Sequence, residues 1–283
     1  MLSYRHSFHA GNFADVLKHT VLVQILRYLG QKDKAFCYID THAGPGDYAL
    51  DSDYALKNRE FDNGIGRLWG RDDLPANVAD YVQLAKQFNA AGQPARYPGS
   101  PWFAKSLLRP QDRLFLYELH PTEQKILQKF AGKDKRATVF HDDGLKHATG
   151  LLPPQERRGL VLIDPSYELK NDYELVIETV VKMHKRFATG TYALWYPVVN
   201  RRRNQSMERA LQCSGIANMH LFELGIQADS EAPGMTACGM IVINPPWTLP
   251  TEMARTLPWL ADTLGIEGAG FYRLQALSVA APE

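Results

Sequence analysis

The sequence contains few cysteines and none of the patterns that define a structural zinc site or a disulfide framework. Its three cysteines, Cys37, Cys213 and Cys238, lie far apart, and no two form a Cys-x-x-Cys pair. Zinc sites need closely spaced ligands, and small secreted scaffolds need a higher density of cysteine. His6 and His9 alone are too few ligands for a metal ion. We therefore expect reduced thiols and no metal.

Long apolar runs and an excess of one charge are also missing. No segment approaches the ~20 apolar residues of a membrane-spanning helix, and the first residues lack a signal-peptide core. We therefore expect a cytoplasmic protein without a membrane partner. The chain is 45% hydrophobic and 22% charged, with a net charge of +1. This composition is globular, and any site for a polyanion must come from a local basic patch.

The sequence also lacks a G-x-G-x-x-G fingerprint and a phosphate-binding loop with its lysine. Short apolar segments nevertheless alternate with helical ones. Strands are expected at 35–39, 114–117, 137–140, 160–163, 192–196, 219–224 and 240–243. Helices are expected at 12–29, 121–131, 172–187 and 205–213. This alternation predicts an α/β fold, a Rossmann-like, seven-stranded and mainly parallel sheet with helices on both faces.

Residues 47–98 interrupt the alternation after the first strand. The segment is polar and turn-rich, with one clear helix near 75–91. We predict a small inserted helical subdomain at 47–98. The main domain is then formed by residues 1–46 and 99–283, and it includes an N-terminal arm and helix at 1–30.

Acidic residues follow four of the expected strands: Asp40, Glu118, Asp143 and Asp164. The carboxyl ends of parallel strands meet at one edge, where such sheets bind ligands. Glu118 suits a ribose diol, and Asp143 with Gly144 suits an adenine edge. This row therefore fits S-adenosyl-L-methionine better than NAD or ATP. The alternative for each acid alone is a solvated turn residue.

The sequence Asp164-Pro165-Ser166-Tyr167 directly follows the fourth expected strand. The N6 lone pair of adenine is delocalised into the purine ring and is a poor nucleophile. The Asp164 carboxylate and the Pro165 carbonyl can accept the two N–H hydrogens and localise that pair. Proline fixes φ, and Tyr167 offers a face on which a base can stack. The competing interpretation is an ordinary strand-to-turn exit.

A second segment, Asn244-Pro245-Pro246-Trp247, has the form that many amino-group methyltransferases use. It follows the seventh expected strand, which we expect to be distant from the fourth in sheet order. We therefore predict a packed proline-tryptophan turn here, with at most a place along the substrate cleft.

The N-terminal residues are dense in histidine, lysine and aromatic side chains. We expect Asn12 to cap a helix that carries Lys18 and His19, and the arm to close over cofactor and substrate. The alternative is a surface helix with solvated charges. The basic run Arg201-Arg202-Arg203 follows the fifth expected strand, which makes it the best candidate for contacts with phosphates.

The chain resembles the ribosomal RNA large subunit methyltransferase J family nearly from end to end. The resemblance rests on the strings YRHSFHAGN (4–12), DVLKH (15–19), DTHAG (40–44), YPGSP (97–101), ELHP (118–121), RFATGTYALWYP (186–197) and GMTA (234–237). It implies a class I S-adenosyl-L-methionine-dependent methyltransferase. The implied reaction is methylation of N6 on one adenine of 23S rRNA. We further expect a monomer that acts on naked or early precursor RNA.

The resemblance also implies residue roles. Asp164 is the catalytic acid, the Pro165 carbonyl is aimed at N6, and Tyr167 flanks the base. The implied cofactor-binding residues are Lys18, His19, His42, Gly44, Ser100, Glu118, Asp143, Gly144 and Asp164. The implied contacts with RNA are Tyr4, His6 and Lys18, to which the residue pattern adds Arg201, Arg202 and Arg203. Ser166 replaces the more usual second proline, and we expect activity to survive because Pro165 is kept.

Two other functions stay open on the sequence. The first is the same chemistry on a DNA adenine or on a glutamine amide of a protein. The second is a non-enzymatic nucleic-acid-binding protein for the use of external DNA as a nutrient.

Overall fold

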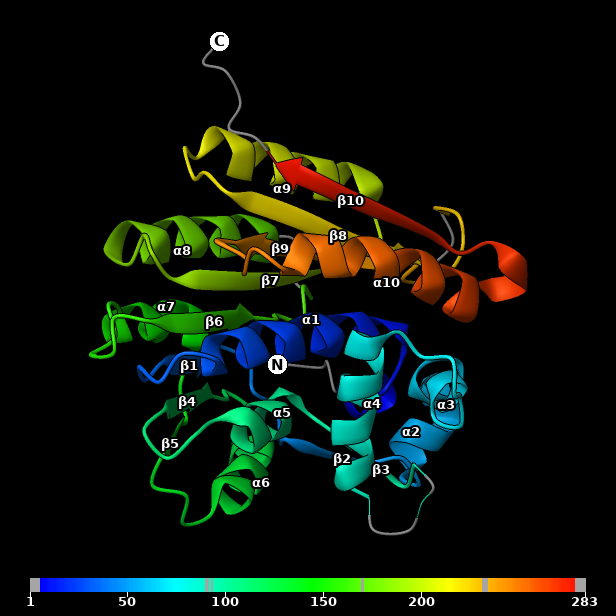
Figure 1. Ribbon diagram of the computed structural model, residues 1–283, viewed down its shortest axis with the longest axis horizontal. Coiled ribbons are helices and arrows are strands. Elements are labelled where there is room, and N and C mark those ends of the chain that lie inside the picture. The colour runs from blue at the N-terminus through cyan, green and yellow to red at the C-terminus, as the bar shows by residue number, and fades with distance from the viewer. Residues whose placement is uncertain (1–5, 90–91, 93, 169–170, 231–233, 278–283) are drawn as a thin grey trace.

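A mixed sheet forms the centre of the computed structural model, which describes residues 6–277 apart from 90–91, 93, 169–170 and 231–233 (Figure 1). Within these residues eight strands join in the order β10-β8-β9-β7-β6-β1-β4-β5. The strands are β1 (Cys37–Asp40), β4 (Arg113–Tyr117), β5 (Ala137–Phe140), β6 (Gly159–Ile163), β7 (Thr191–Val198), β8 (Met219–Gly225), β9 (Ala237–Ile243) and β10 (Phe271–Leu277). Strands β9 and β10 run antiparallel to their neighbours, and the others are parallel.

The seven strands that the sequence predicts are all present, and β10 is an additional one. It pairs with β8 along its whole length, from Phe271 opposite Gly225 to Leu277 opposite Met219. Most of its side chains are half-buried or exposed because it lies at the edge of the sheet. An edge strand shows a weaker apolar pattern than a central one, which explains why the sequence did not predict it.

Helices cover both faces of the sheet and enclose two hydrophobic clusters. On one face lie α1 (Phe13–Gly30), α4 (Ala76–Gln87), α5 (Ser100–Leu107), α6 (Pro121–Ala131) and α10 (Leu249–Leu264), and on the other lie α7 (Gly144–His147), α8 (Asp172–Arg186) and α9 (Arg201–Cys213). The described residues also form short 3-10 helices, which are η1 (His6–Phe8), η2 (Glu60–Asn63), η3 (Ala148–Leu151) and η4 (Ile266–Gly268). No helix in the described part of the chain is both long and apolar enough to cross a membrane.

The N-terminal helix α1 lies across the middle of the sheet (Figure 1). As the sequence predicts, Asn12 caps it, because its side chain accepts hydrogen bonds from the backbone N–H groups of Ala14 and Asp15. The surface-helix alternative is wrong, since Lys18 and His19 are only 5% and 1% exposed. Helix α1 is therefore a core helix that also brings charged groups into the interior.

The segment 47–98 packs against α1 and shares its hydrophobic cluster. It begins and ends in a two-stranded antiparallel ribbon, β2 (Asp47–Ala49) with β3 (Arg96–Pro98), which the sequence did not predict. Between them lie α2 (Asp53–Asn58), η2, α3 (Ile65–Leu68) and α4. Tyr81 on α4 and Tyr97 on β3 are both buried in the cluster that contains α1.

The segment Asn244-Pro245-Pro246-Trp247 lies at the opposite edge of the sheet from Asp164. We expected the strand before this segment to lie far from β6 in the sheet, which is wrong, because only β7 separates β9 from β6. The segment is distant from Asp164 because β9 runs antiparallel to β7 and ends where β7 begins. The Asn244 amide there donates to the Ala188 and Gly190 carbonyls at 2.8 Å. Trp247 is 78% exposed, so the prediction of a packed turn was also wrong.

A buried ion cluster attaches the extra strand to the sheet. Glu223 on β8 is 0% exposed and accepts hydrogen bonds from the Tyr196 hydroxyl at 2.8 Å and from Arg201 Nη1 at 2.7 and 2.8 Å. Arg273 on β10 lies 3.2 Å from the same carboxylate and also pairs with Glu208 on α9. The carboxylate thus joins β7, β8, β10 and α9.

We predict that Glu223→Gln lowers the free energy of unfolding by about 3 kcal/mol, because two guanidinium groups lose a buried counter-charge. Urea denaturation measures this value. Glu178→Gln, at an exposed position on α8, is the matched control and should change stability by less than about 0.5 kcal/mol. Equal stabilities of the two variants would contradict the structural role of the cluster.

Candidate active site

A cavity of about 860 Å³ lies at the carboxyl edge of the parallel strands. It opens beside β1, which lies between β4 and β6 in the sheet. The strands that follow β1 in the chain are first added on the β4 side and then, from β6 on, on the opposite side. Such a switch point is where open α/β sheets bind ligands. Of the residues that the sequence singles out, those that line the cavity are His6, Lys18, His19, His42, Gly44, Ser100, Glu118, Asp143, Gly144, Asp164, Pro165, Tyr167 and Arg203. Tyr4 lies outside the described residues.

The carboxylate at the end of β4 is held in place by backbone donors. Glu118 accepts hydrogen bonds from the Gly44 N–H at 2.9 Å and from the His120 N–H at 2.6 Å. Burial raises the pKa of Glu118, although these two donors oppose the rise. Each carboxylate oxygen keeps a further lone pair, so the group is oriented and still able to accept bonds from a diol.

Two glycines allow the loop after β1 to approach its neighbours. Gly44 has a φ of +61°, and an added Cβ would lie 2.3 Å from the Tyr48 hydroxyl. At Gly144 an added Cβ would lie 2.3 Å from the carbonyl oxygen of Thr41. Asp143 caps the short helix α7 by accepting the Leu145 N–H at 3.1 Å. The backbone at Gly144 can therefore approach the Thr41 backbone at the end of β1.

Asp40, at the end of β1, is completely buried and holds this loop to α5. It accepts the Tyr38 hydroxyl at 2.8 Å, the Ser100 hydroxyl at 2.6 Å and the His42 N–H at 3.2 Å. Burial raises the pKa of Asp40 to about 6, and the hydrogen bonds from Ser100 and Tyr38 act in the opposite direction. The hydroxyl of Ser100 is thus engaged by Asp40.

A chain of charged groups leads from Asp164 to the N-terminal residues. The Lys18 ammonium donates to Asp164 Oδ2 at 2.6 Å and lies 2.8 Å from Asp15 Oδ1, while His6 Nε2 lies 2.8 Å from Asp15 Oδ2. Burial alone would lower the pKa of Lys18, but Asp15 and Asp164 raise it above its ordinary value. Burial alone would raise the pKa of Asp15, but His6 and Lys18 hold it well below its usual range. Both groups are therefore charged.

Tyr167 has an unusual backbone conformation for an aromatic residue, with a φ of +53°. Its hydroxyl donates to the Trp195 carbonyl at 2.8 Å, and its ring lies 4.5 Å from that of Tyr173. Burial raises the pKa of Tyr167 well above its usual range, so the phenol is neutral. Strained residues held in this way are concentrated at functional sites.

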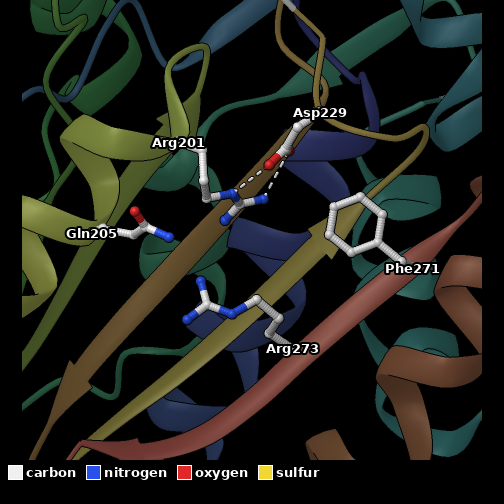
Figure 2. Close-up of a pocket in the computed structure, with 5 residues that line it drawn as sticks. All are labelled: Arg201, Gln205, Asp229, Phe271 and Arg273. Carbon is white, nitrogen blue, oxygen red and sulfur yellow. Dashed lines mark hydrogen bonds and ion pairs between the residues drawn. The ribbon is translucent and has the colours of Figure 1, made fainter.

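Arg201 has a structural role that the basic run did not reveal. Its guanidinium pairs with Asp229 at 2.7 Å as well as with Glu223, and it lines a second cavity of about 470 Å³ (Figure 2). Because its donors are engaged by carboxylates, we withdraw Arg201 from the expected phosphate contacts. Arg203 lines the main cavity and Arg202 is exposed, so these two remain candidates.

Comparison with known proteins identifies the family. The sequence model described as "Ribosomal RNA large subunit methyltransferase D, RlmJ" matches residues 33–277. A protein of Haemophilus influenzae named "Ribosomal RNA large subunit methyltransferase J" is 52% identical over 276 residues, which are 97% of this chain and 98% of the relative. One of Escherichia coli with the same name is 52% identical and covers 95% and 96%. The chain belongs to this family.

One solved structure shares the fold of this methyltransferase J family member along nearly the whole chain. A crystal structure of a Legionella pneumophila protein is 39% identical, with a TM-score of 0.88 over 95% of this chain and 99% of that one. The Rossmann-like, class I methyltransferase fold is confirmed, with eight strands in place of the seven predicted.

Two observations test whether the cavity of this methyltransferase fits S-adenosyl-L-methionine. The His19 Nε2 atom is buried in the cavity wall and has no hydrogen-bond partner among the described residues. The glycine-lined surface beside Thr41 would be filled by a Cβ at Gly144. A buried ring nitrogen without a partner and a close backbone approach both suit a bound ligand, so the residues fit the cofactor.

We predict that Gly144→Ala weakens the binding of S-adenosyl-L-methionine by about tenfold or more, because the new methyl group displaces the Thr41 backbone. Isothermal titration calorimetry measures the affinity. Gly150→Ala is the matched control, since its Cβ would meet no atom within 4 Å. If both variants bound the cofactor like the wild type, the close approach at Gly144 would be irrelevant to binding.

Proposed function

We propose that the protein transfers the methyl group of S-adenosyl-L-methionine to the exocyclic N6 of one adenine in 23S rRNA. The main support is the position of Asp164, which lines the cavity at the end of β6, beside the glycine loop of β1. The names of the two curated relatives support large-subunit ribosomal RNA as the substrate.

The cavity offers a separate environment to each part of the cofactor. Glu118 would hold the ribose diol, and Asp143 with Gly144 would hold the adenine edge. Both lie on the β4 and β5 side of the cavity, away from Asp164. When bound, the cofactor supplies an electrophilic methyl group on a sulfonium. The remaining catalytic work falls to Asp164, Pro165, Tyr167 and Lys18.

Asp164 and Pro165 would prepare the target amine. The carboxylate and the backbone carbonyl accept the two hydrogens on N6, so that the lone pair is directed toward the methyl group. Tyr167, anchored through its hydroxyl to Trp195, supports the face of the base. Proximity and orientation of this kind supply a large part of the acceleration in such reactions. The Lys18 ammonium keeps Asp164 oriented through its 2.6 Å hydrogen bond.

The methylated amine must then lose a proton, and the Asp164 carboxylate can accept it. Lys18 and Asp15 are held in their charged forms, so they would orient Asp164 and would not carry the proton themselves. The side chain of Asp164 is 16% exposed and lines the cavity, so the proton can pass from Asp164 to solvent.

The rim of the cavity suits unpaired RNA. Four exposed apolar side chains line the cavity: Leu119, Leu175, Val199 and Ile266, which are 46%, 38%, 53% and 41% exposed. Apolar side chains can pack against splayed bases, while Arg202 and Arg203 can contact phosphates. A target adenine in a loop, or one flipped out of a helix, could reach Asp164 in this way.

Transfer of labelled methyl groups to unmodified 23S rRNA, DNA and protein tests the proposal. We expect transfer to 23S rRNA, and Asp164→Asn should reduce kcat/KM by at least about 100-fold because the amide cannot accept both the N6 hydrogen and the proton. The matched control, Asp262→Asn, alters an exposed aspartate on α10 and should retain full activity.

Transfer to DNA or to protein with none to RNA would contradict the proposed substrate. Full activity of Asp164→Asn on 23S rRNA would contradict the role of Asp164. Absence of any transfer, together with tight binding of nucleic acid, would favour the non-enzymatic alternative.

A further inference from the structure

The edge of the sheet opposite the cavity is strongly basic. Strands β5, β4, β1, β6 and β7 run parallel to one another, so the segments that enter them meet at their amino ends. We call the surface of these segments, which are residues 31–36, 108–113, 132–136, 152–158 and 185–190, the basic edge. Its basic residues are Lys32, Lys34, Arg109, Arg113, Lys133, Lys135, Arg136, Arg157, Arg158, Lys185 and Arg186, and its acidic residues are Asp33, Asp112, Asp134 and Glu156.

The excess of positive charge is confined to this part of the chain. The whole sequence contains 32 basic and 31 acidic residues, so an average segment would be close to neutral. Eleven basic against four acidic residues give the basic edge a charge of +7, and since the chain carries +1 in total, the rest of it carries −6. Charge gathered on one face attracts a partner of the opposite sign over a long range, and a face of this charge favours a polyanion.

The acidic residues of the basic edge do not neutralise its exposed cations. Three of the four each pair with an arginine of the same edge, and these pairs are Asp112 with Arg109, Asp134 with Arg136 and Glu156 with Arg113. Eight cations remain that form no ion pair within the described residues, and all but Arg158 are exposed: Lys32, Lys34, Lys133, Lys135, Arg157, Arg158, Lys185 and Arg186. Their charges are therefore available to an external anion.

Hydrogen bonds between neighbouring segments join the basic edge into one surface. Arg158 Nη1 donates to the Lys34 carbonyl at 2.6 Å, and Arg109 Nη2 donates to the same oxygen at 3.1 Å. Arg186 Nε donates to the Leu152 carbonyl at 3.0 Å. Burial, together with the nearby charge of Arg109, lowers the pKa of Arg158. Like charges held this close are stabilised when an anion binds beside them.

The dimensions of the basic edge suit the backbone of a folded nucleic acid. Adjacent strands lie about 4.8 Å apart, so the five segments span about 19 Å from β5 to β7, and each supplies at least two basic residues. Strands β1, β4, β5 and β6 are four or five residues long, which places the cavity about 13–17 Å away at their other ends. A phosphate on the basic edge therefore belongs to a nucleotide other than the one in the cavity.

We infer that the basic edge is a second contact surface for 23S rRNA, which binds backbone phosphates away from the target adenine. This inference rests on the proposed function, which takes 23S rRNA as the substrate. A small anion would meet only one or two of the cations, whereas a phosphate backbone can follow the whole row. Contacts of this kind contribute affinity without reading sequence. The cavity would then select the adenine, and the basic edge would hold the surrounding RNA.

Neutralising four exposed lysines tests the contact. The variant combines Lys32→Gln, Lys34→Gln, Lys133→Gln and Lys135→Gln. KM for full-length unmodified 23S rRNA should rise at least about tenfold, while kcat stays within about twofold, because the lost contacts are equally strong in the ground state and the transition state. The slope of the logarithm of the binding constant against that of the salt concentration should become shallower by about 3, since roughly one counterion is released for each phosphate contact.

Two control variants separate local charge from other causes. Arginine at the same four positions keeps the charge and should bind 23S rRNA within about twofold of the wild type. Arg209→Gln combined with Arg255→Gln removes charge from exposed positions on α9 and α10, outside the basic edge, and should leave KM within about twofold. An increase in KM per charge removed that equals that of the lysine variant would indicate an effect of net charge alone and would overturn the inference.

The outcomes distinguish this inference from the proposed function. Wild-type KM and salt slope in the four-lysine variant would show that the basic edge is a solvated face, while the methyltransferase would stand. Binding to vesicles of anionic lipid that depends on these lysines, with none to RNA, would also overturn the inference. If the wild type transfers no methyl group to RNA, the proposed function fails, and filter binding of 23S rRNA without cofactor still tests the contact. If the four-lysine variant does not fold, as judged by thermal unfolding, Lys32→Gln with Lys34→Gln must show the same changes in smaller degree, and their absence would contradict the contact.

Discussion

The Lys18 ammonium, buried between the carboxylates of Asp15 and Asp164, is the interaction on which the site depends. Placing a charge at a position that is 5% exposed is costly unless the charge is paired. Here two carboxylates within 2.8 Å compensate for that cost. The pairing also fixes α1 against the end of β6, so the helix that completes the core also completes the proposed active site.

This arrangement explains the place of the inserted segment. Helix α1 needs apolar neighbours around most of its circumference, and α4 and α5 supply them on the side away from the sheet. Tyr81 and Tyr97 belong to the same hydrophobic cluster, where they also meet His19. Tyr97 of the inserted segment therefore contacts a residue of the cavity wall, so loss of packing in the segment 47–98 should alter the shape of the cavity.

Local sequence patterns predicted the central strands and the acids that follow them. Asp40, Glu118, Asp143 and Asp164 were predictable because the end of a parallel strand fixes where its next residue lies. Strand β10 was missed because an edge strand is only half-buried. The antiparallel direction of β9 was also not predicted. The distance of Asn244 from Asp164 was therefore attributed to sheet order, whereas it results from the direction of β9. Pairing across the fold, as in Arg201 with Glu223 or Tyr97 with His19, depends on residues far apart in sequence and has no local signal.

The central claim is that Asp164 directs methylation of a single adenine in 23S rRNA. The most direct test is to map N6-methyladenine in 23S rRNA from cells that lack this protein and are supplied with either the wild type or Asp164→Asn. The account predicts one adenine that is methylated with the wild type and unmethylated with the variant. An identical methylation pattern in both strains would contradict it.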